Sequence, residues 1–164
     1  MAKERNMSHS TLAVGQVEIT VLHDSEVALP FNRTFPDAPE EAWAPYVERY
    51  PDAYTKNATG DASLRVHFEC YLVRSQGRTL LVDTGLGDSN SNPNGVAQIG
   101  SRSDGVLLSE LEKAEFKAAD VDTVFLTHLH PDHVGWNVTR PTADSAAEVA
   151  PTFPNARYLS LIHI

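Results

Sequence analysis

The sequence predicts an α/β protein in which helices pack against a mostly antiparallel or mixed β-sheet. Two observations support this prediction. Segments rich in β-branched residues are followed by a segment whose apolar residues recur at helical spacing. The expected order of elements is strand, strand pair, helix, strand and helix. Elements in this order bury their apolar faces when the helices cover one sheet.

The first half of the chain predicts strands on either side of an irregular segment. Residues 11–24 are rich in β-branched residues and contain a glycine turn, which predicts an opening strand or hairpin. Residues 63–85 predict two strands joined at Gln76-Gly77 as an antiparallel hairpin. Residues 30–62 hold five prolines and six aromatic residues. The prolines exclude a long regular element, so short helical turns and loops over an apolar surface are expected.

The second half predicts a loop, a helix, a strand and the start of another helix. Residues 86–103 are rich in Gly, Ser and Asn, which is typical of a loop. Residues 104–121 have helical periodicity. Their apolar residues share one helical face: Leu107, Leu108, Leu111 and Ala114. Residues 121–127 predict a short strand buried on both faces, and Pro131 suits the first position of a helix.

Composition limits the classes of function. The 164 residues fit one domain, 1–164, and carry 13 Lys and Arg against 22 Asp and Glu. A net charge of −9 opposes a surface that follows a phosphate backbone, so no nucleic-acid partner is expected. There is no apolar window long enough for a membrane span and no signal peptide, so no membrane partner is expected. The single cysteine, Cys70, suits a reducing compartment, and a cytoplasmic location is expected.

The stretch "TVFLTHLHPDHVGWN" (123–137) predicts a metal site. On an extended backbone, His128 and His130 point the same way and can approach one ion. The chain then turns, which directs Asp132 and His133 toward a neighbouring point. Imidazole and carboxylate ligands suit zinc, and also iron or manganese. Spacing alone gives two half-sites that each need further ligands. The alternative, a His-rich surface turn, is disfavoured by four potential ligands within six residues after a buried strand.

The same residues resemble a known family. "THLHPDH" matches the His-x-His-x-Asp-His signature of metallo-β-lactamase-fold hydrolases. "TLLVDTGLGD" resembles the family's upstream strand and aspartate, and "PTFPNARYL" resembles the strand that follows the metal loop. The resemblance covers roughly residues 63–159. Gly135-Trp136-Asn137 is most similar to the lactonase-like and organophosphate-hydrolase-like branch. The implied fold is the N-terminal half of an αββα sandwich.

The resemblance also implies roles for individual residues. His128 and His130 would bind the first metal, and Asp132 and His133 the second. Asp132 would be catalytic, because it would orient the attacking water or pass a proton to the leaving group. Asp83 matches the upstream aspartate, whose role is to support the ligands from beside the metals. Alternatively, Asp83 is a turn residue that ends its strand, and the sequence leaves both interpretations open.

The family's remaining ligands are a third histidine, a bridging aspartate and a last histidine, all well downstream of the motif. His163 is the only histidine after the motif, and it follows too soon for the third ligand. We therefore expect that the chain is the N-terminal part of a longer protein, truncated at its C-terminus, and that this part alone is inactive.

The expected function is that of a metal-dependent hydrolase. Two divalent ions, zinc by preference, would hold a bridging hydroxide that cleaves a small ester, lactone, amide or organophosphate. The sequence has no Gly-x-Ser-x-Gly elbow and no cysteine suited to nucleophilic catalysis. The alternatives are a thioester hydrolase of the glyoxalase II type, a β-lactamase, a nuclease, which the acidic charge disfavours, and a non-catalytic metal-binding domain.

The expected partner is a small-molecule substrate, and a homodimer is a further candidate. The aromatic residues of 30–62 suit a pocket wall for an acyl or aryl group, or a dimer contact. A purely structural role, covering one edge of the sheet, is the stronger interpretation of the sequence.

Overall fold

The structure is a computed structural model that describes residues 9–57, 60–95, 104–140 and 149–161. The chain divides into two compact units. One consists of Met1–Ser25 and Phe68–Ile164, and the other of Glu26–His67. The larger unit contains the predicted metal motif, and the smaller unit contains most of the Pro-rich and aromatic segment.

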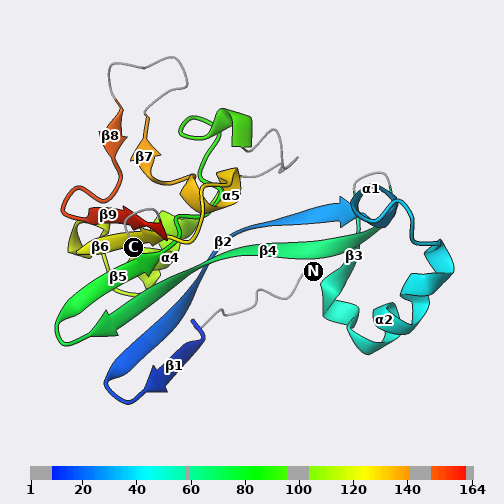
Figure 1. The fold of residues 1–164 in the computed structure, drawn as a ribbon, viewed down its shortest axis with the longest axis horizontal. Coiled ribbons are helices and arrows are strands. Elements are labelled where there is room, and N and C mark those ends of the chain that lie inside the picture. Colours follow the sequence, from blue (N-terminus) through cyan, green and yellow to red (C-terminus); the bar gives the residue numbers. More distant parts are fainter. Residues whose placement is uncertain (1–8, 58–59, 96–103, 141–148, 162–164) are drawn as a thin grey trace. The chain divides into compact units, whose positions relative to one another are not determined.

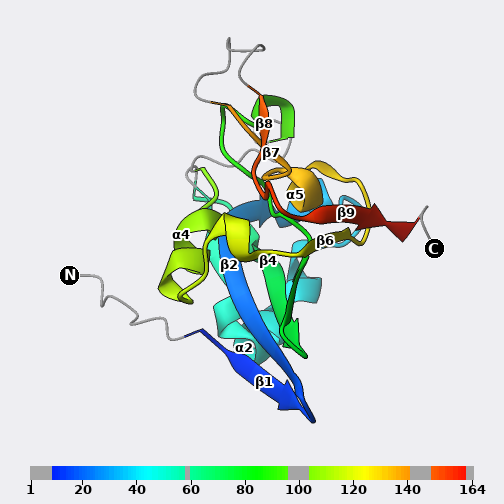
Figure 2. The same cartoon turned by 90° about the vertical axis from the view of Figure 1, so that its left-hand side faces the viewer.

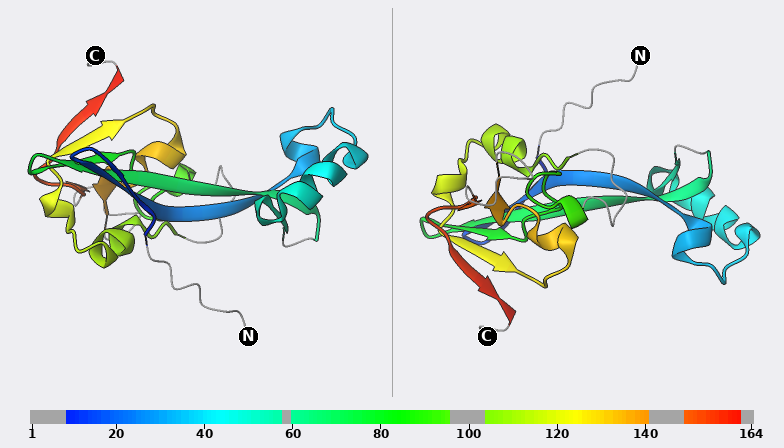
Figure 3. Two further views of the ribbon diagram at one scale, coloured as in Figure 1. Left: turned by 90° about the horizontal axis from the view of Figure 1, so that it is seen from below. Right: turned by 90° about the horizontal axis from the view of Figure 1, so that it is seen from above.

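Six strands form the path of a mixed sheet in the order β1-β2-β4-β5-β6-β9 (Figure 1). They are β1 (Thr11–Val14), β2 (Val17–Pro30), β4 (Ala62–Ser75), β5 (Arg78–Val82), β6 (Thr123–Leu126) and β9 (Arg157–Ser160). β1 pairs with β2, and β4 with β5, as antiparallel hairpins. β6 lies parallel to both β5 and β9, and Figure 3 shows β6 and β9 side by side. The predicted α/β class with a mixed sheet is confirmed.

The predicted hairpin over residues 63–85 is confirmed, and its turn has the expected chemistry. Ser75 pairs with Arg78, which leaves a two-residue loop. Both loop residues have positive φ, 50° at Gln76 and 73° at Gly77. Two positive φ values match the right-handed twist of the adjoining strands, and glycine adopts such a value without strain.

One face of the sheet carries the hydrophobic core. The strand register places Leu72 opposite Leu81, and Leu81 beside Val124, and all three are almost completely buried. Helix α4 (Leu107–Lys113) covers this row with Leu107 and Leu111. Figure 2 shows α4 beside the strands of this unit. The predicted amphipathic helix is therefore present, and its apolar face does pack on the sheet.

Two details differ from the sequence prediction. The helix in 104–121 spans only Leu107–Lys113, because Glu115 takes a left-handed φ of 66° that ends it. The expectation that 121–127 is buried on both faces is wrong. In β6, Val124 and Leu126 are buried while Phe125 is only partly so. The leucines of α4 belong to the same buried cluster as Val124 and Leu126.

Three short elements lie between β6 and β9. Helix α5 (Pro131–Val134) begins at Pro131, as predicted. Strands β7 (Val138–Thr139) and β8 (Ala150–Pro151) form a separate antiparallel pair. A turn of 3-10 helix, η3 (Ala118–Asp120), lies between α4 and β6.

The unit Glu26–His67 confirms the expected short helical turns. It contains α1 (Phe31–Thr34), η1 (Glu40–Trp43), α2 (Ala44–Arg49), η2 (Pro51–Ala53) and β3 (Tyr54–Lys56). Phe31 and Trp43 stack with ring centroids 4.6 Å apart, and Phe31 also contacts Tyr54. These three aromatic side chains thus form an apolar centre within this unit. A role as pocket wall, dimer contact or sheet cover stays a prediction.

No helix among the described residues has both the length and the apolar character needed to cross a membrane.

Candidate metal centre

The predicted ligands lie where two parallel strands end. β5 ends at Val82 and is followed by Asp83, and β6 ends at Leu126 and is followed by Thr127 and the histidine motif. Because β5 and β6 are parallel neighbours, Asp83 and Thr127 lie at the same edge of the sheet. This edge is a common place for functional side chains in sheets with parallel strands.

The structure brings all four predicted ligands together. The rings of His128 and His130 have centroids 4.6 Å apart, and those of His128 and His133 have centroids 3.9 Å apart. Nε2 of His133 lies 3.3 Å from Oδ2 of Asp132. His128 is thus closer to His133 than to His130, so the three imidazoles form one cluster where the sequence suggested two separate pairs.

The chemical types of these donors suit a divalent ion, and one pair of donor atoms has the spacing that a shared ion requires. Ligand atoms that each lie about 2.0–2.1 Å from a tetrahedral ion are about 3.3 Å from one another. The separation of His133 Nε2 and Asp132 Oδ2, 3.3 Å, has this value. The side chains of His128 and His130 are exposed, so their rings can turn toward an ion. Within the described ranges, no three His, Cys, Asp or Glu side chains are already arranged to hold a metal ion.

Asp83 holds His133 and the start of the motif. Its Oδ2 accepts a hydrogen bond from Nδ1 of His133 at 2.8 Å. The Thr127 backbone N–H donates to Oδ1 and the Thr127 hydroxyl to Oδ2, both at 2.8 Å. Because Nδ1 donates to Asp83, the lone pair of His133 Nε2 is left for a metal. Asp83 also has a left-handed φ of 60°. It is a turn residue, and its contacts favour the supporting role as well.

We expect that Asp83→Asn lowers the affinity for zinc about 10- to 100-fold, the usual effect of losing a partner that orients a ligand. Asparagine keeps the shape of Asp83 but replaces one acceptor oxygen by a donor. A competitive titration with a chromogenic chelator measures the change. Asp122→Asn is the matched control, because Asp122 caps the Thr79 N–H at the opposite end of β5. Equal zinc affinity in the two variants would argue against a role for Asp83.

Backbone hydrogen bonds attach the motif helix to the loop after β5. The Thr84 N–H donates to the His133 carbonyl at 2.9 Å, and the Gly135 N–H donates to the Gly85 carbonyl at 2.8 Å. The Trp136 N–H completes the set by donating to the Thr84 carbonyl at 3.0 Å. A helix of only four residues, α5, has little stability of its own, so these bonds determine its position.

Two side chains that the sequence interpretation missed reinforce this attachment. The Asn92 amide donates to the carbonyls of Leu86 at 2.8 Å and Pro131 at 2.9 Å. The Thr84 hydroxyl lies 3.0 Å from the Asn137 side-chain oxygen, to which it donates. Nothing in the local sequence marks Asn92, because its partners lie in the loop after β5 and at the start of α5.

A third missed residue, Asp24, lies on β2 with only 1% of its surface exposed. It accepts hydrogen bonds from the backbone N–H groups of Leu86 and Leu107 and from the Trp136 indole N–H. Burial raises the pKa of Asp24 above its usual 3.8, although these hydrogen bonds oppose the rise. The folded state therefore loses stability as the pH rises from about 3.8 through the raised pKa of Asp24, because the buried side chain must then ionise. The sequence does contain a sign that Asp24 is buried. Side chains alternate between the two faces of a strand, so Asp24 shares a face with the buried Leu22.

Cys70 is not a nucleophile. It is completely buried in the core, and burial raises the pKa of its thiol well above the usual value. A thiol in such surroundings stays protonated and unreactive.

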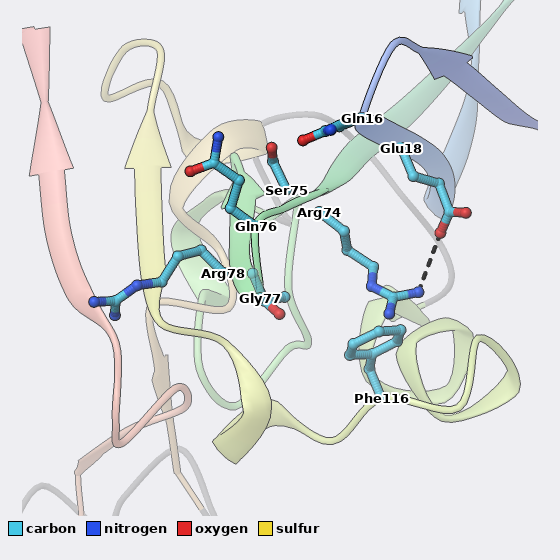
Figure 4. Close-up of a pocket in the computed structure, with 9 residues that line it drawn as sticks. Gln16, Glu18, Arg74, Ser75, Gln76, Gly77, Arg78 and Phe116 are labelled. Carbon is cyan, nitrogen blue, oxygen red and sulfur yellow. Dashed lines mark hydrogen bonds and ion pairs between the residues drawn. The ribbon is translucent and has the colours of Figure 1, made fainter.

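A cavity of about 310 Å³ lies at the turn of the β4–β5 hairpin, at the end of β5 that is far from Asp83 (Figure 4). Its residues include Arg74, which donates to Glu18 at 3.1 Å and lies over the ring of Phe116. The cavity adjoins the beginning of β5, whereas Asp83 follows the end of that strand. It is therefore separate from the candidate metal centre.

Comparison with known proteins agrees with this architecture. Residues 69–139 match the model of the metallo-beta-lactamase superfamily. No curated protein sequence matches the chain. Among solved structures, the hydrolase AbOPH of the beta lactamase superfamily is 26% identical, with a TM-score of 0.68 over 94% of this chain and 45% of its own. A probable metal-dependent hydrolase from Staphylococcus aureus is 18% identical, with a TM-score of 0.66 over 90% of this chain and 47% of its own.

A third solved structure is AidC, a dizinc quorum-quenching lactonase that is 24% identical. Its TM-score is 0.65 over 92% of this chain and 43% of its own. The chain thus spans less than half the length of these three proteins. The matched segment 69–139 contains Asp83 and the whole histidine motif. The chain has the metallo-β-lactamase fold, and its residues 69–139 match the model of the metallo-β-lactamase superfamily.

Proposed function

We propose that the protein is a metal-dependent hydrolase that acts on a small ester, lactone, amide or organophosphate. One observation carries the proposal. Three imidazoles and a carboxylate cluster at the edge where β5 and β6 end, and Asp83 fixes one of the imidazoles. The 26% identity to the hydrolase AbOPH supports the same conclusion.

Each residue of the cluster has a part in this proposal. His128 with His130, and Asp132 with His133, would hold two divalent ions, zinc by preference. Divalent ions held there would lower the pKa of bound water to about 7 and would polarise the carbonyl or phosphoryl oxygen of the substrate. The Asp132 carboxylate is the group on this loop that can orient the water or give a proton to the leaving group. Asp83 binds Nδ1 of His133, which leaves the lone pair of Nε2 for a metal.

The surface beside the cluster suits a substrate with an apolar part. Leu129 lies between two of the histidines and is 68% exposed. An exposed leucine beside polar reacting groups can bind an alkyl or acyl chain. We regard lactones as the first candidate substrates because AidC, a lactonase, shares the fold.

We expect that the protein, expressed with any coding sequence that follows Ile164 in the gene and loaded with zinc, hydrolyses lactones or aryl esters. A chelator should abolish this activity, and added zinc should restore it. The assay compares a lactone, an aryl ester, an organophosphate, a thioester and a β-lactam. Preference for the thioester or the β-lactam would favour a glyoxalase II-type enzyme or a β-lactamase. Failure to cleave any of the five would contradict the proposal.

The alternative is a non-catalytic metal-binding domain. Within the described residues no three potential ligands share one ion site, so the cluster needs further ligands before it can carry out hydrolysis. The two candidates differ in the sequence that encodes the remaining ligands. A histidine, an aspartate and a further histidine encoded beyond position 164 would support the hydrolase. Tight zinc binding without turnover, and without such codons, would support the binding domain.

A further inference from the structure

We infer that Asp24 is a positioning residue that holds the metal-binding loop in place through Trp136. This inference rests on the proposed function in one respect, namely that the loop over residues 128–133 binds metal. Asp24 itself would touch neither metal nor substrate. Its role would be to fix the backbone that carries Asp132 and His133.

The contacts of Asp24 join three segments that are distant in the sequence. Oδ2 accepts from the Leu86 N–H at 2.6 Å, in the loop after β5. Oδ1 accepts from the Leu107 N–H at 2.9 Å, at the start of α4, and from the Trp136 indole at 2.8 Å. The Asp24 carbonyl also accepts from the Val106 N–H at 2.8 Å. One buried side chain therefore connects β2, the β5 loop, α4 and the metal-binding segment.

Trp136 is the connection to the metal-binding loop. It lies three residues after His133 and is 7% exposed. Its indole N–H donates to Asp24, while its backbone N–H donates to the Thr84 carbonyl, next to Asp83. A displaced Trp136 would therefore disturb both the end of α5 and the aspartate that orients His133.

The surroundings of Asp24 are shaped for a carboxylate. A Cβ atom added at Gly85 or at Gly105 would collide with the Asp24 side chain, so the backbone approaches it closely from two sides. Three N–H donors point at its two oxygens. In the described part of the chain, its hydrogen-bond partners are neutral N–H groups. A buried carboxylate without a cation is costly, which favours a role that an apolar residue could not fill.

The test combines Asp24→Asn and Trp136→Phe with their double variant. Asparagine keeps the shape of Asp24 but presents an NH₂ group to donors. Phenylalanine keeps most of the Trp136 ring and removes only the indole donor. Two quantities are measured on each folded protein: the zinc affinity, and amide hydrogen exchange in the absence of metal. Exchange is followed at Gly135 and Trp136, whose N–H groups hold the loop, and at Ala114 and Asp122 as references.

We expect that both single variants speed exchange at Gly135 and Trp136 on the order of tenfold, with little change at the reference amides. Zinc affinity should fall in both, and the double variant should be no weaker than Asp24→Asn, because the two residues act through one contact. Glu110→Gln is the control, since Glu110 is a buried carboxylate on α4 that binds His9 and Lys113. It should lower the melting temperature without changing zinc affinity or loop exchange.

Loop exchange and zinc affinity that match the parent protein, with only a lower melting temperature, would overturn the inference. If Asp24→Asn does not fold, the inference is tested with Trp136→Phe alone, by the same measurements of zinc affinity and amide hydrogen exchange. If the parent protein binds no zinc, the proposed function fails, while the exchange rates still show whether Asp24 positions the loop.

Discussion

Replacing both His128 and His130 by alanine should remove zinc from the first of the two expected metal positions. The two imidazoles are neighbours, with ring centroids 4.6 Å apart, and both are exposed at the sheet edge. Their loss takes away two ligands at once, so the affinity at this position should fall by more than the roughly 100-fold that follows the loss of a supporting residue. Zinc content after dialysis, measured by elemental analysis, should drop by one ion per chain.

The matched control removes two imidazoles from elsewhere in the chain. His9→Ala with His67→Ala changes side chains that contact Glu110 and Glu26 and lie outside the motif. This variant should keep the full zinc content. Equal zinc content in the two double variants would show that the histidine motif does not bind the metal.

Gly135→Ala should destabilise the protein by about 3 kcal/mol or more, at the upper end for overpacking. Gly135 has helical dihedral angles, so alanine is not strained by its backbone conformation. An added Cβ would instead collide with the backbone of Leu86 and Gly87. Backbone atoms cannot rotate away, so α5 would have to separate from the loop after β5. The melting temperature and the denaturant midpoint measure the loss.

The predicted loss of stability is opposite in sign to the usual effect of replacing a helical glycine by alanine. At a helical position with free space, alanine is more stable than glycine by about 0.5–1 kcal/mol. Gly77→Ala provides the control for backbone strain alone, because nothing lies within 4 Å of its Cβ position and its φ is 73°. A Gly135→Ala protein as stable as the parent would mean that α5 does not pack against this loop as described.

Local patterns were sufficient to predict several elements. The hairpin at Gln76-Gly77 follows from two alternating segments that flank a turn with a glycine, and its register depends only on that turn. Pro131 marked the start of α5, because proline suits the first turn of a helix. The histidine spacing predicted for a similar reason that the four side chains lie near one another, since all of them lie within six residues; it suggested two pairs, whereas the structure has one cluster of imidazoles.

Features that depend on tertiary contacts could not be predicted in the same way. Asp24 meets its partners 62 to 112 residues away in the sequence, so its hydrogen bonds leave no local pattern. The partial exposure of Phe125 depends on which face α4 covers, and periodicity does not specify that. The proximity of His128 to His133 depends on the rotation of α5 about its axis, which the bonds to Thr84 and Gly85 determine.

The central claim is that one loop binds divalent metal through His128, His130, Asp132 and His133. Anomalous X-ray scattering at the zinc edge, from crystals of the zinc-loaded protein, tests it most directly. The account predicts anomalous peaks within bonding distance of these side chains, one beside His128 and His130 and one beside Asp132 and His133. Zinc-loaded crystals with no anomalous peak at this loop would contradict it.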